Sequence, residues 1–260
     1  MTICCFPSLH LPSWRAPQRG FSLLEVSVVL VVAGLMSWAA FSGYETVSAQ
    51  QEIERGRAEA HQLQSVIRAF ALRHGRLPCP DAAGTGYESL TSGNCTSGTQ
   101  VGWFPYASAG LPIPSDPLRA RYSVFRSANV DVTRDADLAV ALERSGDAEG
   151  ADTFRDVTDL IVALNSASRM TFASSRTHIT GDGGASGNID CATNAFMAVA
   201  YWVVVPLQDR DNDDSRLDPP HALNSVCAAS PSAPRRRLSD DVVMAESPIQ
   251  LAGWLRSSLP

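Results

Sequence analysis

Arg19-Gly20-Phe21-Ser22-Leu23-Leu24-Glu25, followed by the apolar residues 26–36 (Val-Ser-Val-Val-Leu-Val-Val-Ala-Gly-Leu-Met), is the stretch that decides the fold. The apolar run from Phe21 to Phe41 has the length of a membrane-spanning helix, about 20 residues. Glu25 is the only charged residue between Arg19 and Glu45. A carboxylate costs roughly 2.5–3.5 kcal/mol at the centre of a bilayer, so this glutamate is expected to have a specific role.

These residues carry a family resemblance. The segment from Arg19 to Glu25 resembles the cleavage and methylation signal of type IV prepilins and type II secretion pseudopilins. The resemblance implies that a prepilin peptidase cuts between Gly20 and Phe21 and methylates the new terminal amine of Phe21. It also implies that Glu25 is the carboxylate used in assembly, where it would pair with the terminal amine of a neighbouring subunit.

A secretory signal peptide and a plain signal anchor are the alternatives for the N-terminus. The apolar run is longer than the ~7–15 residues of a signal-peptide core and contains an internal glutamate. The small residues near Ala39 and Ala40 are flanked by Trp38 and Phe41, which makes a poor cleavage site. The prepilin interpretation is therefore preferred.

The charge balance argues against a general nucleic-acid-binding protein. The chain of 260 residues has a net charge of −6, and removal of residues 1–20 takes away two arginines and no acid. Contacts with phosphate require a positive surface. The run Arg235-Arg236-Arg237 is interpreted as a solvated charge cluster, and no nucleic-acid partner is expected.

Six cysteines are present, and Cys4 and Cys5 lie in the leader. An even number of remaining cysteines after an export signal predicts disulfides. The preferred pairs are Cys79–Cys95 and Cys191–Cys227, because each pair is nearest in sequence and closes a loop rich in small or polar residues. Buried thiols and a zinc site are the alternatives, although no Cys-x-x-Cys pair supports zinc.

A long helix is predicted from Phe21 to about His74. No proline occurs between Arg19 and Leu77, and after Tyr44 apolar residues recur at helical spacing. That stripe contains Val47, Ile53, Leu63, Val66, Ile67, Phe70 and Ala71. Gly75 offers a C-terminal cap, and the prolines that follow prevent continuation. The apolar face is expected to pack on a globular domain.

The segment after the helix strengthens the resemblance. Leu77-Pro78-Cys79-Pro80, Gly102-Trp103-Phe104-Pro105 and the Gly110-Leu111 turn precede a strand expected at residues 121–125. Near the end, Asp240-Asp241-Val242-Val243 is followed by a short helical pattern. These elements resemble a minor-pilin-like subfamily of prepilin-type proteins.

The middle of the chain resembles no family, so its elements rest on pattern alone. A short helix is expected at Asp137–Arg144 and a helix or buried segment at residues 154–167. Ala195–Val205 is predicted to be one central strand of eleven residues, covered on one face by the long helix. Residues 208–237 are expected to form a loop.

One cluster has the composition of a cation site. Asp209, Asp211 and Asp213 alternate along the chain, so their oxygens could converge on Ca²⁺. The positions where a helix-loop-helix calcium site requires glycine and glutamate hold Asp214 and Pro220, which favours a solvated acidic loop instead. No other cofactor is expected. No nucleophile–base motif or phosphate loop occurs, so the chain is not expected to be an enzyme.

The expected organisation is a leader at 1–20, a transmembrane or assembly half-helix at 21–42, an amphipathic half-helix at 43–75 and a globular domain at 76–260. The fold class is α+β, with the long helix packed on an antiparallel sheet. The resemblance implies a minor subunit of a type IV pilus. A minor pseudopilin of type II secretion and a signal-anchored binding module that does not polymerise are the alternatives.

The resemblance also implies the partners and the location. The partners would be prepilin peptidase, other pilin or pseudopilin subunits, the inner-membrane assembly platform and membrane lipid. Arg15 and Arg19 predict a cytoplasmic leader by the positive-inside rule. The domain would then lie in the periplasm until the subunit enters a filament.

Overall fold

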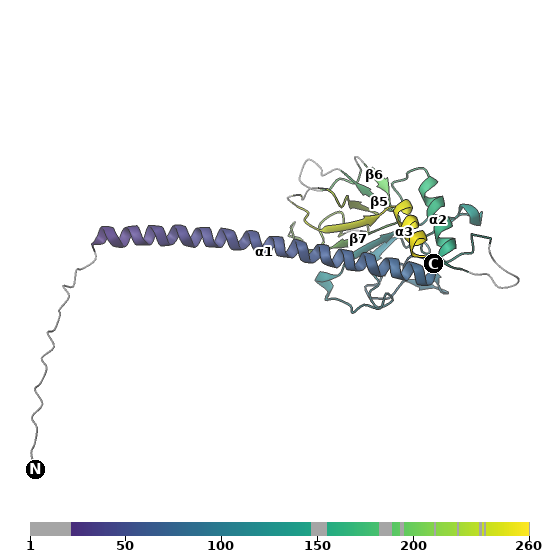
Figure 1. Ribbon diagram of the computed structural model, residues 1–260, viewed down its shortest axis with the longest axis horizontal. Coiled ribbons are helices and arrows are strands. Elements are labelled where there is room, and N and C mark those ends of the chain that lie inside the picture. The colour runs from purple at the N-terminus through teal and green to yellow at the C-terminus, as the bar shows by residue number, and fades with distance from the viewer. Residues whose placement is uncertain are drawn as a thin grey trace, which may run out of the picture. The chain divides into compact units, whose positions relative to one another are not determined.

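The computed structural model describes residues 22–146, 155–181, 189–192, 195–210, 212–222, 224–233, 236 and 238–259, with only the backbone at 42, 43, 45, 46 and 195. Helix α1 runs from Leu23 to His74, as the sequence predicts (Figure 1). The chain divides into two compact units, Met1–Ala49 and Gln50–Pro260. Each unit is described by itself below.

Both ends of α1 have a local cause. The Ser22 hydroxyl accepts the backbone N–H of Glu25 at 3.2 Å, which satisfies one of the free donors of the first turn. At the other end, Gly75 adopts φ +60° and its N–H reaches the carbonyl of Ala71 at 3.0 Å. Glycine is favoured there because a left-handed residue terminates the helix at little steric cost.

Within the second unit, α1 buries a stripe of apolar side chains. Ala60, Leu63, Ile67 and Ala71 are each at most 2 % exposed. The predicted stripe is therefore confirmed from Leu63 to Ala71. It is wrong at Val47, which lies in the first unit and is 53 % exposed.

Four antiparallel strands form the main sheet in the order β3-β4-β7-β9. Their bounds are Val101–Trp103, Arg121–Val124, Tyr201–Val205 and Val242–Glu246. Alternate residues of β7 enter two apolar cores. Tyr201, Val203 and Val205 belong to the core that contains the α1 stripe, whereas Trp202 and Val204 belong to the core on the other face. The expectation of an α+β fold with an antiparallel sheet under the long helix is confirmed.

The predicted strand Ala195–Val205 is wrong as a single element. Ala195–Ala198 is β6, in a second sheet, and only Tyr201–Val205 joins the main sheet as β7. Between them the chain is held by two different neighbours: Val199 N–H bonds to the carbonyl of Thr177, and Ala200 N–H to that of Glu246. The apolar run is continuous because both pieces are strands, yet its hydrogen-bond partners change in the middle.

The second sheet has the order β6-β5-β8, with β5 at His178–Thr180 and β8 at Cys227–Ala229. β5 pairs in parallel with β8 and antiparallel with β6. Strand β8 lies inside residues 208–237, so the expectation that all of that segment is loop is wrong. Its three residues are buried, which a polar and proline-rich sequence context conceals.

Two shorter helices complete the domain. Helix α2, Val157–Arg169, and helix α3, Pro248–Ser258, each begin with a capping box. In Figure 1 they lie next to each other at one end of the domain. Both confirm helical patterns in the sequence. The helix predicted at Asp137–Arg144 is absent, since that segment consists of turns and extended chain.

Both preferred disulfides are confirmed, Cys79–Cys95 and Cys191–Cys227. The first ties the segment after α1 to a small hairpin formed by β1, Leu90–Thr91, and β2, Asn94–Cys95. The second ties β8 to the chain just before β6. Cross-links of this size restrict the unfolded chain, a stabilisation of about 3 kcal/mol each in the entropic account.

Candidate functional site

The N-terminal segment of α1 exposes apolar side chains on all its sides. Residues Leu23–Phe41 are long enough and apolar enough to cross a membrane, with a mean hydropathy of 2.1, and none of them is buried. Individual exposed fractions run from 44 % at Val32 to 91 % at Leu23. A continuous apolar surface of this size marks a membrane or protein contact in a stable protein.

Glu25 is the acidic residue in the first turn of this helix. Its backbone is held by Ser22, and its side chain is exposed. The sequence-predicted role in assembly stays a prediction, and so does the cleavage point, because Gly20 and Phe21 lie outside the described residues. What the structure places is a single carboxylate within an apolar, exposed helical surface.

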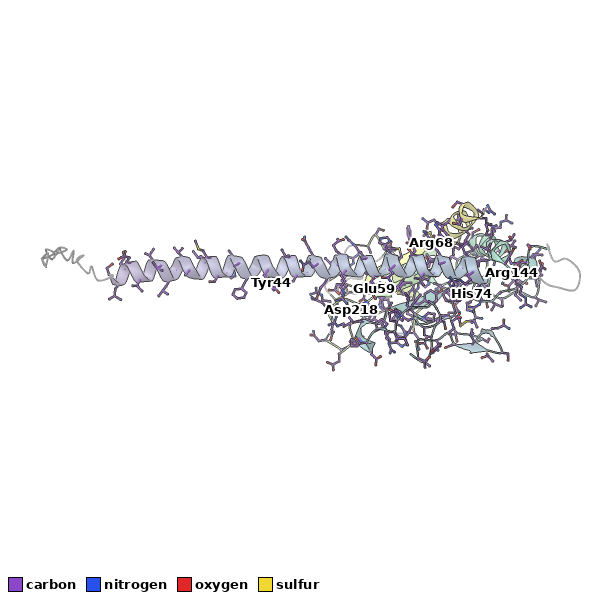
Figure 2. All side chains as sticks on the ribbon, turned by 60° about the horizontal axis from the view of Figure 1, so that its bottom comes forward. Tyr44, Glu59, Arg68, His74, Arg144 and Asp218 are labelled. Atoms are coloured by element: carbon purple, nitrogen blue, oxygen red, sulfur yellow. A yellow bond between two sulfur atoms is a disulfide. The ribbon has the colours of Figure 1, made fainter. Side chains whose placement is uncertain are left out.

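The second unit contains a different constellation, which we call the acidic cluster: Asp218, Asp240 and Asp241. Each offers one carboxylate oxygen, and these oxygens all lie within 4.8 Å of one another. Asp218 is fully buried, Asp240 is 5 % exposed and the Asp241 side chain is 0 % exposed. Asp218 is labelled in Figure 2. Among the residues that the structure describes, this is the one group of three acids or metal-ligating side chains so arranged.

Backbone N–H groups hold the cluster in place. Asp218 accepts from Arg210 N–H and Asp240 N–H, both at 3.0 Å, and Asp218 N–H donates to Asp241 Oδ2 at 3.1 Å. The guanidinium of Arg210 donates to Asp240 Oδ2 at 2.5 Å. These hydrogen bonds hold the carboxylates close together, although their like charges repel one another.

His221 lies against the cluster and its tautomer follows from its contacts. Its Nε2 accepts the backbone N–H of Ala229 at 3.2 Å, so the ring proton is on Nδ1 and is donated to Asp241 Oδ2 at 2.8 Å. An imidazolium would carry a proton on both nitrogens and could not accept that bond. His221 therefore orients Asp241 without neutralising it.

Burial and the repulsion between the carboxylates raise the pKa values of Asp218 and Asp241. Burial raises the pKa of Asp218 to about 6, against the backbone donors that lower it, and the charges of Asp241 and Asp240 raise it further. Burial also raises the pKa of Asp241, partly offset by the hydrogen bond from His221. One oxygen, Asp241 Oδ1, is buried and has no hydrogen-bond partner among the residues that the structure describes.

The loop predicted to bind calcium uses its carboxylates locally. Asp209 accepts the backbone N–H groups of Asn212, Asp213 and Asp214, and Asp213 Oδ1 accepts that of Ser215. Asp211 lies outside the described residues. Calcium binding at Asp209, Asp211 and Asp213 stays a prediction.

Sequence reasoning identified Asp240 and Asp241 only as adjacent acids and placed His221 in a loop, so it missed the acidic cluster. Asp218 and Asp240 are 22 positions apart, as the hydrogen bond between them records. The pair Asp240-Asp241 directly before an apolar strand was a signal in the sequence, because charged residues are unusual where the chain is buried. It could not name the third carboxylate.

The geometry defines a class: an α+β domain that follows an N-terminal apolar helix with one acid in its first turn. Residues 15–41 match the prokaryotic N-terminal methylation motif, which indicates membrane anchoring through that helix. Over part of its length the chain is also similar to type IV pilins. The motif and the homology confirm the resemblance stated from the sequence; the Leu77–Pro80 detail is not tested by them.

Three relatives define the extent of the similarity. The type IV major pilin protein PilE1 of Neisseria gonorrhoeae is 26% identical over 61 residues, 24% of this chain and 37% of that protein. The type IV major fimbrial protein FimA of Dichelobacter nodosus is 25% identical over 99 residues, 38% of this chain and 63% of that protein. A fimbrial protein of Neisseria meningitidis serogroup B is 25% identical over 85 residues, 32% and 50% of the two chains.

The matches therefore span between about a third and two thirds of each relative's own length. No solved structure matches the chain significantly. The relatives are named as pilins and fimbrial proteins, not as enzymes.

Proposed function

We propose that the chain is a minor pilin-like structural subunit of a type IV pilus, cut after Gly20 by a prepilin peptidase and assembled into the filament or at its tip. The observation that carries the proposal is the continuity of the methylation motif with an apolar helix exposed on all sides. Such a helix needs a lipid environment before assembly and contact with other helices afterwards. In the filament, those other helices would belong to neighbouring pilin subunits.

Glu25 is the assembly residue in this proposal. Cleavage after Gly20 would create a terminal amine on Phe21, four positions before Glu25. In a low-dielectric filament core a carboxylate must be matched by a positive charge, and this amine of an adjacent subunit supplies it. No other charged residue lies between Arg19 and Glu45 to do so.

Two features support a periplasmic location for the domain before assembly. Disulfides form in oxidising compartments, and the domain has two. The arginines of the leader, Arg15 and Arg19, favour a cytoplasmic N-terminus. The subunit would thus be a single-pass inner-membrane protein that meets the assembly platform from its membrane helix.

The minor role rests on size and architecture. The described residues after the helix form a four-stranded sheet, a three-stranded sheet, a two-stranded hairpin, the helices α2 and α3, and two disulfides. The relatives named as major pilin and major fimbrial protein match only 24% and 38% of this chain. A domain of this size is better accommodated at a few positions or at a tip than along a whole shaft.

Processing is the first test. The membrane-bound protein would be expressed with and without a prepilin peptidase, and its intact mass and N-terminal sequence measured. We expect N-methylated Phe21 as the first residue only when the peptidase is present. A chain that stays uncut, or is cut near Ala39 and Ala40, would leave a signal-anchored or secreted domain in place of a pilin.

Assembly is the second test. Glu25→Ala should be cleaved normally and be absent from sheared filaments, whereas Glu54→Ala, an exposed acid later on α1, should be incorporated like the unmodified protein. Normal incorporation of Glu25→Ala contradicts the assigned role. If the unmodified protein entered the pseudopilus of a type II secretion system instead of a pilus, the pseudopilin alternative would be favoured.

A further inference from the structure

We propose that the acidic cluster of Asp218, Asp240 and Asp241 is a buried site for one Ca²⁺ ion. The site uses none of the carboxylates predicted to bind calcium in the loop at 209–213, although Arg210 of that loop donates hydrogen bonds to Asp218 and Asp240. The inference does not rest on the proposed function, since it concerns the domain whether or not the chain polymerises.

The first argument is a charge balance. Three buried carboxylates converge, and the described side chains that contact them supply one cation, the Arg210 guanidinium on Asp240. His221 contributes none, because its Nε2 accepts a backbone hydrogen bond. When the three carboxylates are ionised, the described side chains that contact them leave about two negative charges uncompensated, and an unpaired charge in a protein interior is costly. A divalent cation matches that deficit.

The second argument is an unpartnered atom. Asp241 Oδ2 accepts two hydrogen bonds, from Asp218 N–H and from His221, while Oδ1 is buried and accepts none. Buried polar atoms are almost always satisfied, so an orphaned carboxylate oxygen beside two other carboxylates points to a missing positive ligand. A hydrogen bond from the protein is not available to it among the described residues.

The chemistry of the donors selects the ion. All three ligands are carboxylates, which favour hard cations over zinc or copper. Both ring nitrogens of His221 are engaged, so it cannot ligate without losing a bond. Two oxygens on one Ca²⁺ lie at most about 4.6–5.2 Å apart, since each bond is about 2.3–2.6 Å. The oxygens of the acidic cluster lie within 4.8 Å of one another, which falls within this range.

Space for water ligands is present beside the cluster. Asp240 and Asp241 line a cavity of about 220 Å³ that is also bounded by residues of α1. Ca²⁺ takes six to eight oxygens, so about half of its ligands would be water or backbone carbonyls. Arg57 and Arg236 also line this cavity, but the ion pairs of the described residues join neither of them to the three carboxylates.

The test uses full-length protein in detergent micelles, freed of metal with EGTA and then titrated with CaCl₂ while thermal unfolding is followed. A hundredfold excess of Ca²⁺ over its Kd should raise the Tm by about 5–10 °C for a domain of this size. Asp241→Asn should abolish the rise. The matched control Asp213→Asn, in the exposed loop, should respond like the unmodified protein.

A crossing of stabilities makes the test specific. In EGTA, Asp241→Asn should unfold at the same temperature as the unmodified protein or higher, because it removes an uncompensated buried charge. In 5 mM CaCl₂ the order should reverse. Should Asp241→Asn fail to fold, Asp218→Asn takes its place, and metal analysis of the unmodified protein after dialysis against Ca²⁺ should find one bound ion per chain, displaced by EGTA.

Four outcomes overturn the proposal. They are no Tm response of the unmodified protein to 5 mM CaCl₂, an unchanged response in Asp241→Asn or its substitute, loss of the response in Asp213→Asn alone, and a larger response to Mg²⁺ than to Ca²⁺. The third would place binding in the loop predicted from sequence. Processing and filament assembly are measured in separate experiments, so a negative result there does not affect the result of the calcium titration.

Discussion

At the scale of single residues, Asp159 shows how a buried acid is used structurally. It is 1 % exposed, and its Oδ1 accepts the backbone N–H groups of Arg144 and Ser145 while Oδ2 accepts that of Asp156. Burial alone would raise its pKa, but these backbone donors outweigh burial and lower it. The charge of Asp159 therefore stabilises the start of α2.

Asp159→Asn should destabilise the domain by about 1–3 kcal/mol at pH 7, because the amide must turn a donor toward one of the N–H groups that now meet oxygen. The lowered pKa gives the sign of the pH dependence. The contribution is complete above the ordinary pKa of 3.8 and is lost as pH falls through the lower folded value. Chemical denaturation of both proteins from pH 7 to pH 3 should show the difference shrinking. Asp116→Asn, 85 % exposed, is the control and should change little at any pH.

A substitution at Gly75 tests why α1 ends where it does. Its φ of +60° is unfavourable for residues with a Cβ, and an added Cβ would lie 2.5 Å from the carbonyl oxygen of Asp156. We expect Gly75→Ala to lower the free energy of unfolding by about 1–2 kcal/mol or more. Gly253→Ala in α3 is the matched control, since nothing lies within 4 Å and helical alanine should add about 0.5–1 kcal/mol. Equal effects of the two changes, measured by urea denaturation, would contradict the capping argument.

At the scale of elements, a partly buried ion pair joins α1 to the main sheet. Glu246 ends β9 and is 2 % exposed. Its two oxygens accept from Arg68 of α1 at 2.6 and 3.2 Å, and Oε2 also accepts from the Tyr201 hydroxyl. The Arg68 guanidinium lies over the ring of Trp254 in α3, 4.9 Å from its centroid. Figure 2 labels Arg68 on this part of α1.

Removal of one partner leaves the other charge without compensation, so Glu246→Ala should lower the free energy of unfolding by about 3 kcal/mol. Glu54→Ala is the comparison, because Glu54 and Arg57 form a pair on the same helix with both side chains more than 60 % exposed. Exposed pairs contribute about 0–1 kcal/mol. Calorimetry of both variants should therefore separate them by several degrees. A small effect of Glu246→Ala would mean that the apolar stripe alone holds α1.

The elements differ in how far sequence could predict them. α1 and α2 follow from periodicity and from residues that start or stop helices, because those signals are local. The strand at 195–205 was predicted as one piece because apolarity does not encode which sheet a residue joins. The segment Asp137–Arg144 has helical composition, yet Asp137 pairs with Arg126 and Arg144 with Asp135, both buried. These ion pairs join side chains 11 and 9 positions apart, a spacing that helical periodicity does not predict.

The two candidate sites divide in the same way. Glu25 could be predicted because the signal that surrounds it lies within seven consecutive residues. The acidic cluster could not, since Asp218 and Asp240 are 22 positions apart and come together only in the folded domain. Its three carboxylates are held together by backbone hydrogen bonds, which leave no pattern in the sequence.

At the scale of the whole molecule, the buried hydrophobic residues begin at Ala60, although the described chain begins at residue 22. Both apolar cores are built from residues after that point. The second unit, Gln50–Pro260, therefore contains its own cores, its sheets and both disulfides. The stability of the domain is accounted for within that unit.

A chain that starts at Gln50, produced in an oxidising compartment, should consequently fold without residues 1–49. Its thermal midpoint should lie within about 2–4 °C of the domain transition in the full-length protein, which corresponds to no more than about 1 kcal/mol. It should also stay monomeric in water, because the deleted helix carries the large exposed apolar surface. Circular dichroism melts and sedimentation without detergent would measure both properties. A fall of 10 °C, or loss of a cooperative transition, would show that residues before Gln50 stabilise the domain. Full-length protein that stays monomeric without detergent would contradict the part assigned to the exposed helix, and with it the reason for placing that helix in a membrane or among other subunits.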